Sequence, residues 1–137
     1  MAILDYEYDP SAIPAEIKRG IDFLYEAADR KDAVDAWAGC FSKSGKLLKG
    51  AQSPIGTEAL RDYLAASWNN TDSRVHDVKS VSVIQTSPLT LKIEGHTTYQ
   101  RSDGQQEAGT WTAEQSYVQE DGMQKIAEYK INFNMLS

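Results

Sequence analysis

His76 and His96 are the only histidines in the 137-residue sequence, and histidine is the side chain best suited to proton transfer near neutral pH. His76 lies near the start of a predicted strand, on the face that it shares with Val78 and Ser80. We take His76 as a candidate acid/base group, the alternative being a hydrogen-bonded structural histidine. His96 shares its strand face with Lys92, which predicts that it points to solvent or to a subunit interface.

Glu128 and Asn132 alternate with Ile131 and Phe133 along the last predicted strand. The ordinary interpretation places the apolar face inside the protein and the polar face in water. The alternative is that the polar face lines a cavity while the apolar face packs on a second subunit. Among Trp and Tyr side chains a desolvated glutamate becomes a usable general acid or base. On this second hypothesis Glu128 and His76 form the acid/base pair.

Large aromatic residues come from predicted helices and strands that would converge, and their ordinary role is to pack a core. A tyrosine hydroxyl at a cavity wall can also stabilise a developing oxyanion by donating a hydrogen bond. Tyr99 is the candidate for this role, because it ends a series of inward-facing residues. The other residues predicted to contact a substrate are Trp37, Tyr63, Trp68, Trp111, Gln115, Tyr117 and Asn132.

The sequence carries no signature of a metal, a cofactor or a nucleophilic triad. No cluster of His, Cys and carboxylate residues has metal-ligand spacing, and no glycine-rich phosphate loop is present. No serine lies in a nucleophile elbow. Cys40, the single cysteine, is interpreted as a small buried apolar residue. We therefore expect chemistry that needs neither metal nor cofactor.

The charge balance argues against nucleic acid as a partner, because 14 basic and 20 acidic residues give a net charge of −6. Lys43, Lys46 and Lys49 are interpreted as solvated lysines that discourage strand-edge pairing. No apolar run approaches the length of a membrane helix, and the N-terminus lacks the features of a signal peptide. We expect a soluble cytoplasmic protein that does not bind membranes.

The pattern of apolar residues predicts one α+β domain over residues 1–137, with helices collected against one face of a strongly curved sheet. Ile17, Ile21 and Leu24 mark the buried face of a first helix that starts near Pro14. A second helical segment over 32–41 follows, and the sequence leaves open whether it is a separate helix or the continuation of one bent helix. A short strand at 46–49 and a third helix after Gly56 come next. Four strands then form an antiparallel meander, at 74–85, 89–100, about Trp111–Tyr117, and 125–135.

Motifs along nearly the whole chain resemble the SnoaL-like branch of the NTF2-like superfamily, and small fungal members of that group in particular. They are Leu24-Tyr25-Glu26-Ala27-Ala28-Asp29, Trp37…Phe41, Gly45-Lys46-Leu47, Gly56-Thr57-Glu58-Ala59-Leu60, Trp68…Arg74-Val75-His76 and Gly95…Tyr99…Asp103-Gly104…Trp111. The resemblance implies a cone, in which helices and a curved, mostly antiparallel sheet enclose a deep pocket for an apolar small molecule. His76 is similar to a pocket histidine of fungal scytalone dehydratase.

Two classes of function are compatible with this resemblance. The first is a cofactor-independent isomerase, cyclase or dehydratase that acts on a secondary metabolite, with His76 and Glu128 as acid and base and Tyr99 on an oxygen of the substrate. The second is a non-catalytic NTF2-like module that binds a ligand or a protein. We favour the enzyme, and we expect a homodimer through the outer face of the sheet.

Overall fold

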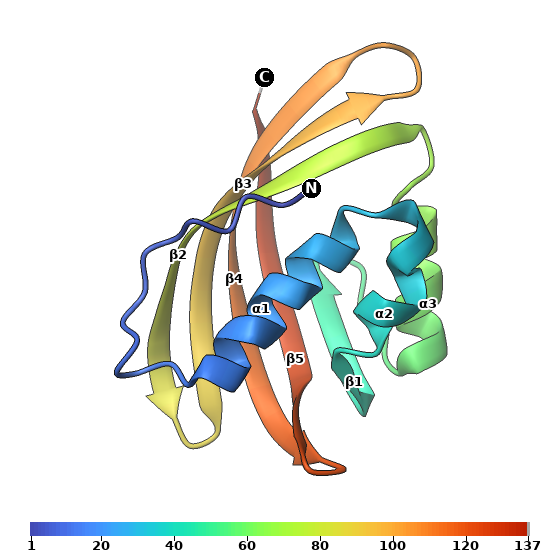
Figure 1. Ribbon diagram of the computed structural model, residues 1–137. Helices are drawn as coiled ribbons and strands as arrows, with labels where there is room; N and C mark the ends of the chain where they lie inside the picture. The colour runs from blue at the N-terminus through green and yellow to red at the C-terminus, as the bar shows by residue number, and fades with distance from the viewer. Residues whose placement is uncertain (137) are drawn as a thin grey trace.

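The computed structural model describes residues 1–136, which form three helices and one five-stranded sheet (Figure 1). None of the helices within these residues is long and apolar enough to cross a membrane. A short 3-10 turn, Lys31–Ala33, precedes the second helix. The helices are α1 (Ala15–Ala28), α2 (Val34–Ala38) and α3 (Thr57–Ala66), and the strands are β1 (Phe41–Lys49), β2 (Thr71–Thr86), β3 (Leu89–Arg101), β4 (Gln106–Glu120) and β5 (Met123–Leu136).

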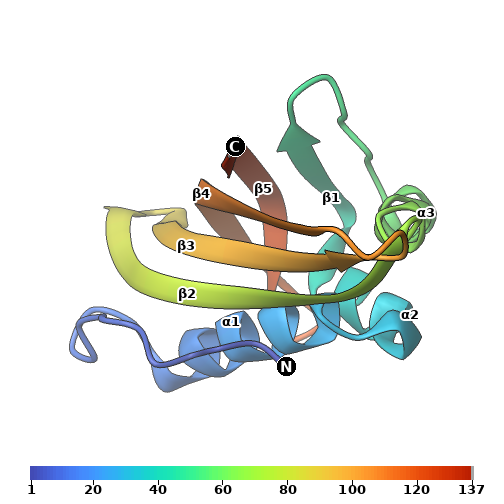
Figure 2. The same ribbon diagram turned by 90° about the horizontal axis from the view of Figure 1, so that it is seen from above.

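The sheet has the order β1-β5-β4-β3-β2, in which β2 to β5 are an antiparallel meander and β1 lies parallel to β5. The turn between β4 and β5 is tight because Asp121 and Gly122 both adopt positive φ angles, as a two-residue hairpin turn requires. Figure 2 shows the sheet strongly curled, with α1 along one of its faces. The predicted α+β class, with helices against a curved and mostly antiparallel sheet, is confirmed.

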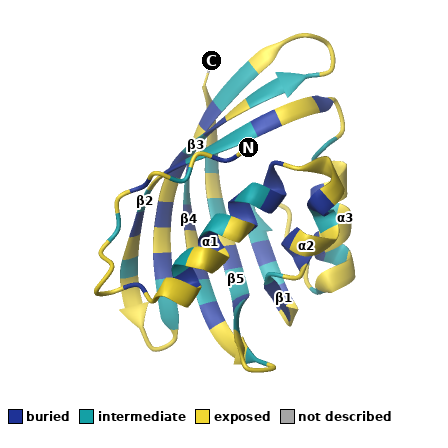
Figure 3. Ribbon diagram, viewed as in Figure 1, coloured by how far each residue is buried: buried dark blue, intermediate teal, exposed yellow. Residues whose placement is uncertain are grey.

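Helix α1 forms where apolar residues recur at helical spacing, and its buried face includes Ile17, Ile21, Leu24 and Ala28. Each of these side chains is at most 5% exposed. Figure 3 shows buried and exposed residues alternating along α1, as expected of an amphipathic helix on a sheet. Because α1 ends at Ala28, the next residue, Asp29, is delivered to the interior next to β2.

The second helix is shorter than the sequence predicts. It ends at Ala38, and Phe41 is the first residue of β1 instead of part of the helix. The backbone N–H of Ile126 donates a hydrogen bond to the carbonyl of Cys40, 3.0 Å away, so pairing with β5 begins directly after Gly39. Tertiary pairing outweighs the local helical pattern, and it also makes β1 five residues longer at its start than predicted.

Both outer strands of the sheet are covered by other segments of the chain. Along β2, the N–H of Ile3 donates to the carbonyl of His76 at 2.8 Å, and the N–H of Val78 donates to the carbonyl of Ile3 at 3.0 Å. Along β1, Lys49 and Gln52 exchange two backbone hydrogen bonds of 3.0 Å. The N-terminal segment therefore fixes the part of β2 that carries His76.

Candidate functional site

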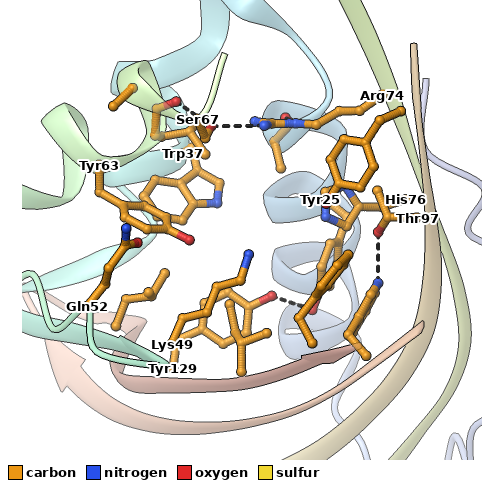
Figure 4. Close-up of a pocket in the computed structure, with 18 of the residues that line it drawn as sticks. Tyr25, Trp37, Lys49, Gln52, Tyr63, Ser67, Arg74, His76, Thr97 and Tyr129 are labelled. Carbon is orange, nitrogen blue, oxygen red and sulfur yellow. Dashed lines mark hydrogen bonds between the residues drawn. The ribbon is translucent and has the colours of Figure 1, made fainter. Parts of the chain in front are cut away.

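A cavity of about 490 Å³ lies between the helices and the sheet (Figure 4), a volume typical of small-molecule sites. Residues from α1, α2, α3 and all five strands contribute to its wall. Its aromatic lining residues are Tyr25, Trp37, Tyr63, Tyr99, Trp111, Tyr129 and Phe133, and its polar ones include Lys49, Gln52, Ser67, Arg74, His76, Thr97 and Arg101.

Asp29 and His76 form a hydrogen-bonded pair at this wall. The Oδ1 atom of Asp29 lies 2.6 Å from the Nδ1 atom of His76, and its Oδ2 atom accepts the backbone N–H of His76 at 2.8 Å. The side chain of Asp29 is fully buried, and that of His76 is 18% exposed. The carboxylate thus holds both the backbone and the ring of His76 in one orientation.

The carboxylate of Asp29 determines which ring nitrogen of His76 carries the proton. A carboxylate only accepts hydrogen bonds, so we assign the proton to Nδ1 of His76 in the neutral ring. Nε2 then keeps its lone pair, and it has no hydrogen-bond partner within residues 1–136. Tyr25 and Trp111 flank the ring, with centroid distances of 5.4 Å and 6.0 Å. His76 is therefore held in one orientation, with one ring nitrogen free of a hydrogen-bond partner within residues 1–136.

Four tyrosines bring hydroxyl groups to the cavity wall. The hydroxyls of Tyr25 and Tyr129 are 2.7 Å apart and bond to each other. The hydroxyls of Tyr63 and Tyr99 have no hydrogen-bond partner in the part of the chain that the structure describes. Burial raises the pKa of Tyr63 and of Tyr99 above its ordinary value, so both remain protonated phenols that can donate to a ligand oxygen.

Three cationic side chains also line the cavity, and the charge of one of them is balanced by a neighbouring carboxylate. The guanidinium of Arg101 pairs with the carboxylate of Glu107. Lys49 and Arg74 form no salt bridge with any of residues 1–136. The wall of this cavity therefore carries two positive charges without a salt-bridge partner, in a protein whose net charge is −6.

Five of the residues predicted from the sequence do line the cavity: His76, Tyr99, Trp37, Tyr63 and Trp111. Trp37 stacks on Tyr63 at a centroid distance of 6.2 Å, and the Nε1 atom of Trp111 donates to Thr97 at 2.8 Å. His96 is not among the lining residues, in agreement with its predicted strand face. The roles proposed for these residues stay predictions.

The placement of Glu128 and Asn132 in the cavity is wrong. Tyr129, Ile131 and Phe133 line it instead, so the apolar face of β5 points inward. Glu128 lies on the opposite face, 3.6 Å from the Nζ atom of Lys46, with a side chain 40% exposed. The ordinary strand pattern therefore holds, and Glu128 is too far outside to pair with His76.

Trp68, Gln115 and Tyr117 do not line the cavity either, contrary to the prediction. Trp68 lies behind Arg74, whose guanidinium stacks 3.9 Å from the centre of its ring. Gln115 is fully buried and accepts a hydrogen bond from the Tyr117 hydroxyl at 2.6 Å.

Sequence reasoning missed the partner of His76 and both free cations. Asp29 directly follows the apolar stripe of α1, a signal that could have placed it at the buried end of the helix. Lys49 shares its strand face with Leu47, which is completely buried, so simple alternation already points Lys49 inward. The interpretation of Lys49 as a solvated edge lysine is therefore wrong, whereas Lys46 does lie outside. Arg74 shares its strand face with His76 by the same argument.

The described residues contain no group of three or more His, Cys, Asp or Glu side chains arranged to hold a metal ion. The ionisable groups at the cavity wall include one oriented histidine, two free phenols and two cations. Together they can move a proton, stabilise negative charge on an oxygen and attract an anion.

Neither a protein-family model nor a curated protein matches the sequence, but solved structures match the fold. A candidate aromatic ring hydroxylase from Novosphingobium aromaticivorans aligns with a TM-score of 0.81 at 13% identity, over 88% of this chain and 90% of the other. A candidate scytalone dehydratase from the same bacterium gives 0.73 at 12% identity, over 88% and 83%.

An NTF2-like protein of unknown function from Exiguobacterium gives a TM-score of 0.70 at 16% identity, over 84% of this chain and 98% of the other. These similar structures are bacterial, and the resemblance to fungal members stays a prediction. At such low identity the agreement concerns the backbone. The chain has the NTF2-like α+β fold.

Proposed function

We propose that this protein is a cofactor-independent enzyme that transfers a proton to and from a small, largely apolar molecule bound in the cavity. This step is common to the isomerases, cyclases and dehydratases expected from the sequence. The observation that carries the proposal is the pair of Asp29 and His76, in which a buried carboxylate orients a histidine and leaves Nε2 without a partner. The function of such a pair is to prepare one ring nitrogen as a base.

In the proposed reaction, Nε2 of His76 takes a proton from a carbon next to a carbonyl group of the substrate. The electron pair of the broken C–H bond moves into the carbonyl, which becomes an enolate. Asp29 stabilises the imidazolium, and a phenol, Tyr99 or Tyr63, donates a hydrogen bond to the enolate oxygen. The imidazolium then returns the proton, to another carbon in an isomerisation or to a departing hydroxide in a dehydration.

Two further observations support an aromatic or polycyclic substrate. The cavity is lined by flat aromatic side chains such as Trp37 and Trp111, which favour ring-shaped ligands. Among the proteins of similar fold, one is named as a candidate aromatic ring hydroxylase and another as a candidate scytalone dehydratase. These names belong to those proteins, and they enter only as support for the class of ligand.

Hydrogen exchange at carbon tests this proposal without knowledge of the natural substrate. Cyclic aryl ketones, beginning with 2-tetralone, are incubated with the protein in D₂O, and loss of the signal of the C–H next to the carbonyl is followed by proton NMR. We expect the protein to accelerate exchange above the buffer rate, and His76→Ala to abolish the acceleration. His96→Ala is the matched control, because His96 does not line the cavity.

Exchange no faster than in buffer for every ketone of the panel would contradict the enzyme and would favour the non-catalytic binding module. Equal exchange by the wild type and His76→Ala would contradict the assignment of the base. The ketones carry no charge, so their binding needs no ion pair with the two cations in the wall.

A further inference from the structure

Arg74 places a permanent positive charge in the cavity wall. It is only 5% exposed, and its Nε and Nη1 atoms donate to the carbonyl of Ala28 and to Oγ of Ser67, each at 2.8 Å. Its Nη2 atom is buried without any hydrogen-bond partner in residues 1–136. A guanidinium keeps its charge in proteins, and a buried N–H without an acceptor is costly. Arg74 therefore lacks one acceptor that the described chain does not supply.

Lys49 places a second positive charge in the same cavity. Its side chain leaves the end of β1 and points into the cavity, as Figure 4 shows, with the Nζ atom 4.8 Å from the centre of the Phe133 ring. Burial lowers the pKa of Lys49, and the nearby charge of Arg74 lowers it further. Two cations that repel each other thus line the same cavity.

The charges in this region do not cancel. Asp29 is the buried carboxylate near Arg74, and its charge offsets one of the two cations. Arg101 is balanced by Glu107. With His76 neutral, one positive charge remains, in a chain whose net charge is −6. An excess of one charge matches a ligand with a single negative group.

We propose that the substrate is an aromatic carboxylate, whose carboxylate binds between Lys49 and Arg74 while its rings lie against the aromatic wall near His76. This proposal names the substrate class for the proposed function, and its reaction rests on that function. The binding of the carboxylate does not depend on it. The carboxylate gives Lys49 a counter-charge and offsets the charge of Arg74, which lines the same cavity. A doubly charged phosphate would exceed the single positive charge that is available. The expectation of a purely apolar ligand is thereby refined.

Paired ligands that differ only in charge test this proposal. 2-Naphthoate and its neutral analogue 2-naphthamide are titrated into the protein, with tryptophan fluorescence and calorimetry as readouts, and a panel of other aromatic acids and their amides follows. We expect the acid to bind at least about tenfold more tightly than the amide, because hydrogen bonds to charged groups are the stronger ones. Lys49→Met should remove this preference, and Lys49→Arg should keep most of it.

Lys46→Met is the matched control, because Lys46 lies on the same strand but pairs with Glu128 on the outer face. It should keep the full preference for the acid. Melting curves of each variant verify that it is folded. Equal binding of acids and amides by the wild type, an unchanged preference in Lys49→Met, or no binding of any acid at millimolar concentration would overturn the proposal.

The experiments test the proposed enzyme and the proposed carboxylate site independently of each other. Equilibrium binding does not require the base, so His76→Ala should still prefer the acid. A preference for acids without ketone exchange would contradict only the enzyme, and ketone exchange without that preference would contradict only the carboxylate site.

Discussion

Asp29 accepts two hydrogen bonds from a single residue, His76, which lies 47 positions later in the chain. One bond comes from the backbone N–H and the other from the ring, so the carboxylate fixes the strand and the side chain together. A shift of α1 along the sheet would break both bonds at once. The orientation of the ring is therefore coupled to the packing of α1 on β2.

Asp29→Asn should lower ketone exchange by at least about 100-fold while the cavity keeps its shape. An asparagine can turn its NH₂ group toward Nδ1, which then has to accept, and the ring proton moves to Nε2. The free nitrogen is lost as a base, although the side chain has almost the same size. Exchange rates of the two proteins in D₂O at equal pD measure the effect.

Ligand binding provides the control for Asp29→Asn. Neutral 2-naphthamide should bind to the variant as it binds to the wild type, because the change removes no wall atom. If Asp29→Asn kept the wild-type exchange rate, the carboxylate would only support the fold.

Lys49→Met should stabilise the ligand-free protein by roughly 0.5–2 kcal/mol at neutral pH, the range usual when a strained functional site is relaxed. The pKa of Lys49 is lowered in the folded state from its ordinary 10.5, so folding disfavours the charged amine. This penalty is complete below the folded pKa and is relieved as the pH rises through that value toward 10.5. Denaturant unfolding at neutral pH and near pH 10 measures the difference in the free energy of unfolding between Lys49→Met and the wild type. This difference should be smaller at the higher pH.

Gly95 has to be a glycine because the indole ring of Trp111 lies directly over it. A Cβ atom at Gly95 would overlap that ring, so Gly95→Ala should cost about 1–3 kcal/mol of stability and should displace a wall residue. Gly20 in α1 is the control, since a Cβ atom there meets nothing within 4 Å. Gly20→Ala should gain roughly 0.5–1 kcal/mol from helix propensity. Thermal unfolding measures both changes: the melting temperature should fall in Gly95→Ala and rise in Gly20→Ala.

Glu128→Gln should leave ketone exchange and ligand binding unchanged, because Glu128 lies outside the cavity. Its ion pair with Lys46 is exposed, and such pairs contribute less than about 1 kcal/mol. The measurements are the exchange assay and a melting curve. A large loss of exchange in this variant would mean that the outer face of β5 takes part in the reaction.

The sequence predicts the order of elements well because each carries its own periodic pattern, as Ile17, Ile21 and Leu24 do in α1. It predicts the end of α2 less well, because pairing of Phe41 with Ile126 is a long-range contact that leaves no local signal. For the site, alternation places His76 and Tyr99 at the cavity. The same alternation, applied to Leu47 and Ile131, would have placed Lys49 inside and Glu128 outside.

The partner of His76 could not be found in this way. Asp29 follows a helix, and a helix end does not reveal which strand it meets. The link between Asp29 and His76 depends on how α1 crosses the sheet, which is a property of the whole fold. Arg74 is likewise visible as a strand residue, but its missing acceptor appears only when Ala28 and Ser67 are in place.

The covered outer strands determine how copies of this protein can meet. Ile3 occupies hydrogen-bonding groups of β2 beside His76, and Gln52 does the same for Lys49 at the end of β1. An added strand from another molecule would first have to displace these segments, so edge-to-edge growth of the sheet into fibres is opposed. The homodimer expected from the sequence stays a prediction. If it forms, flat contact between outer sheet faces is the geometry that leaves both edges, and thus His76, undisturbed.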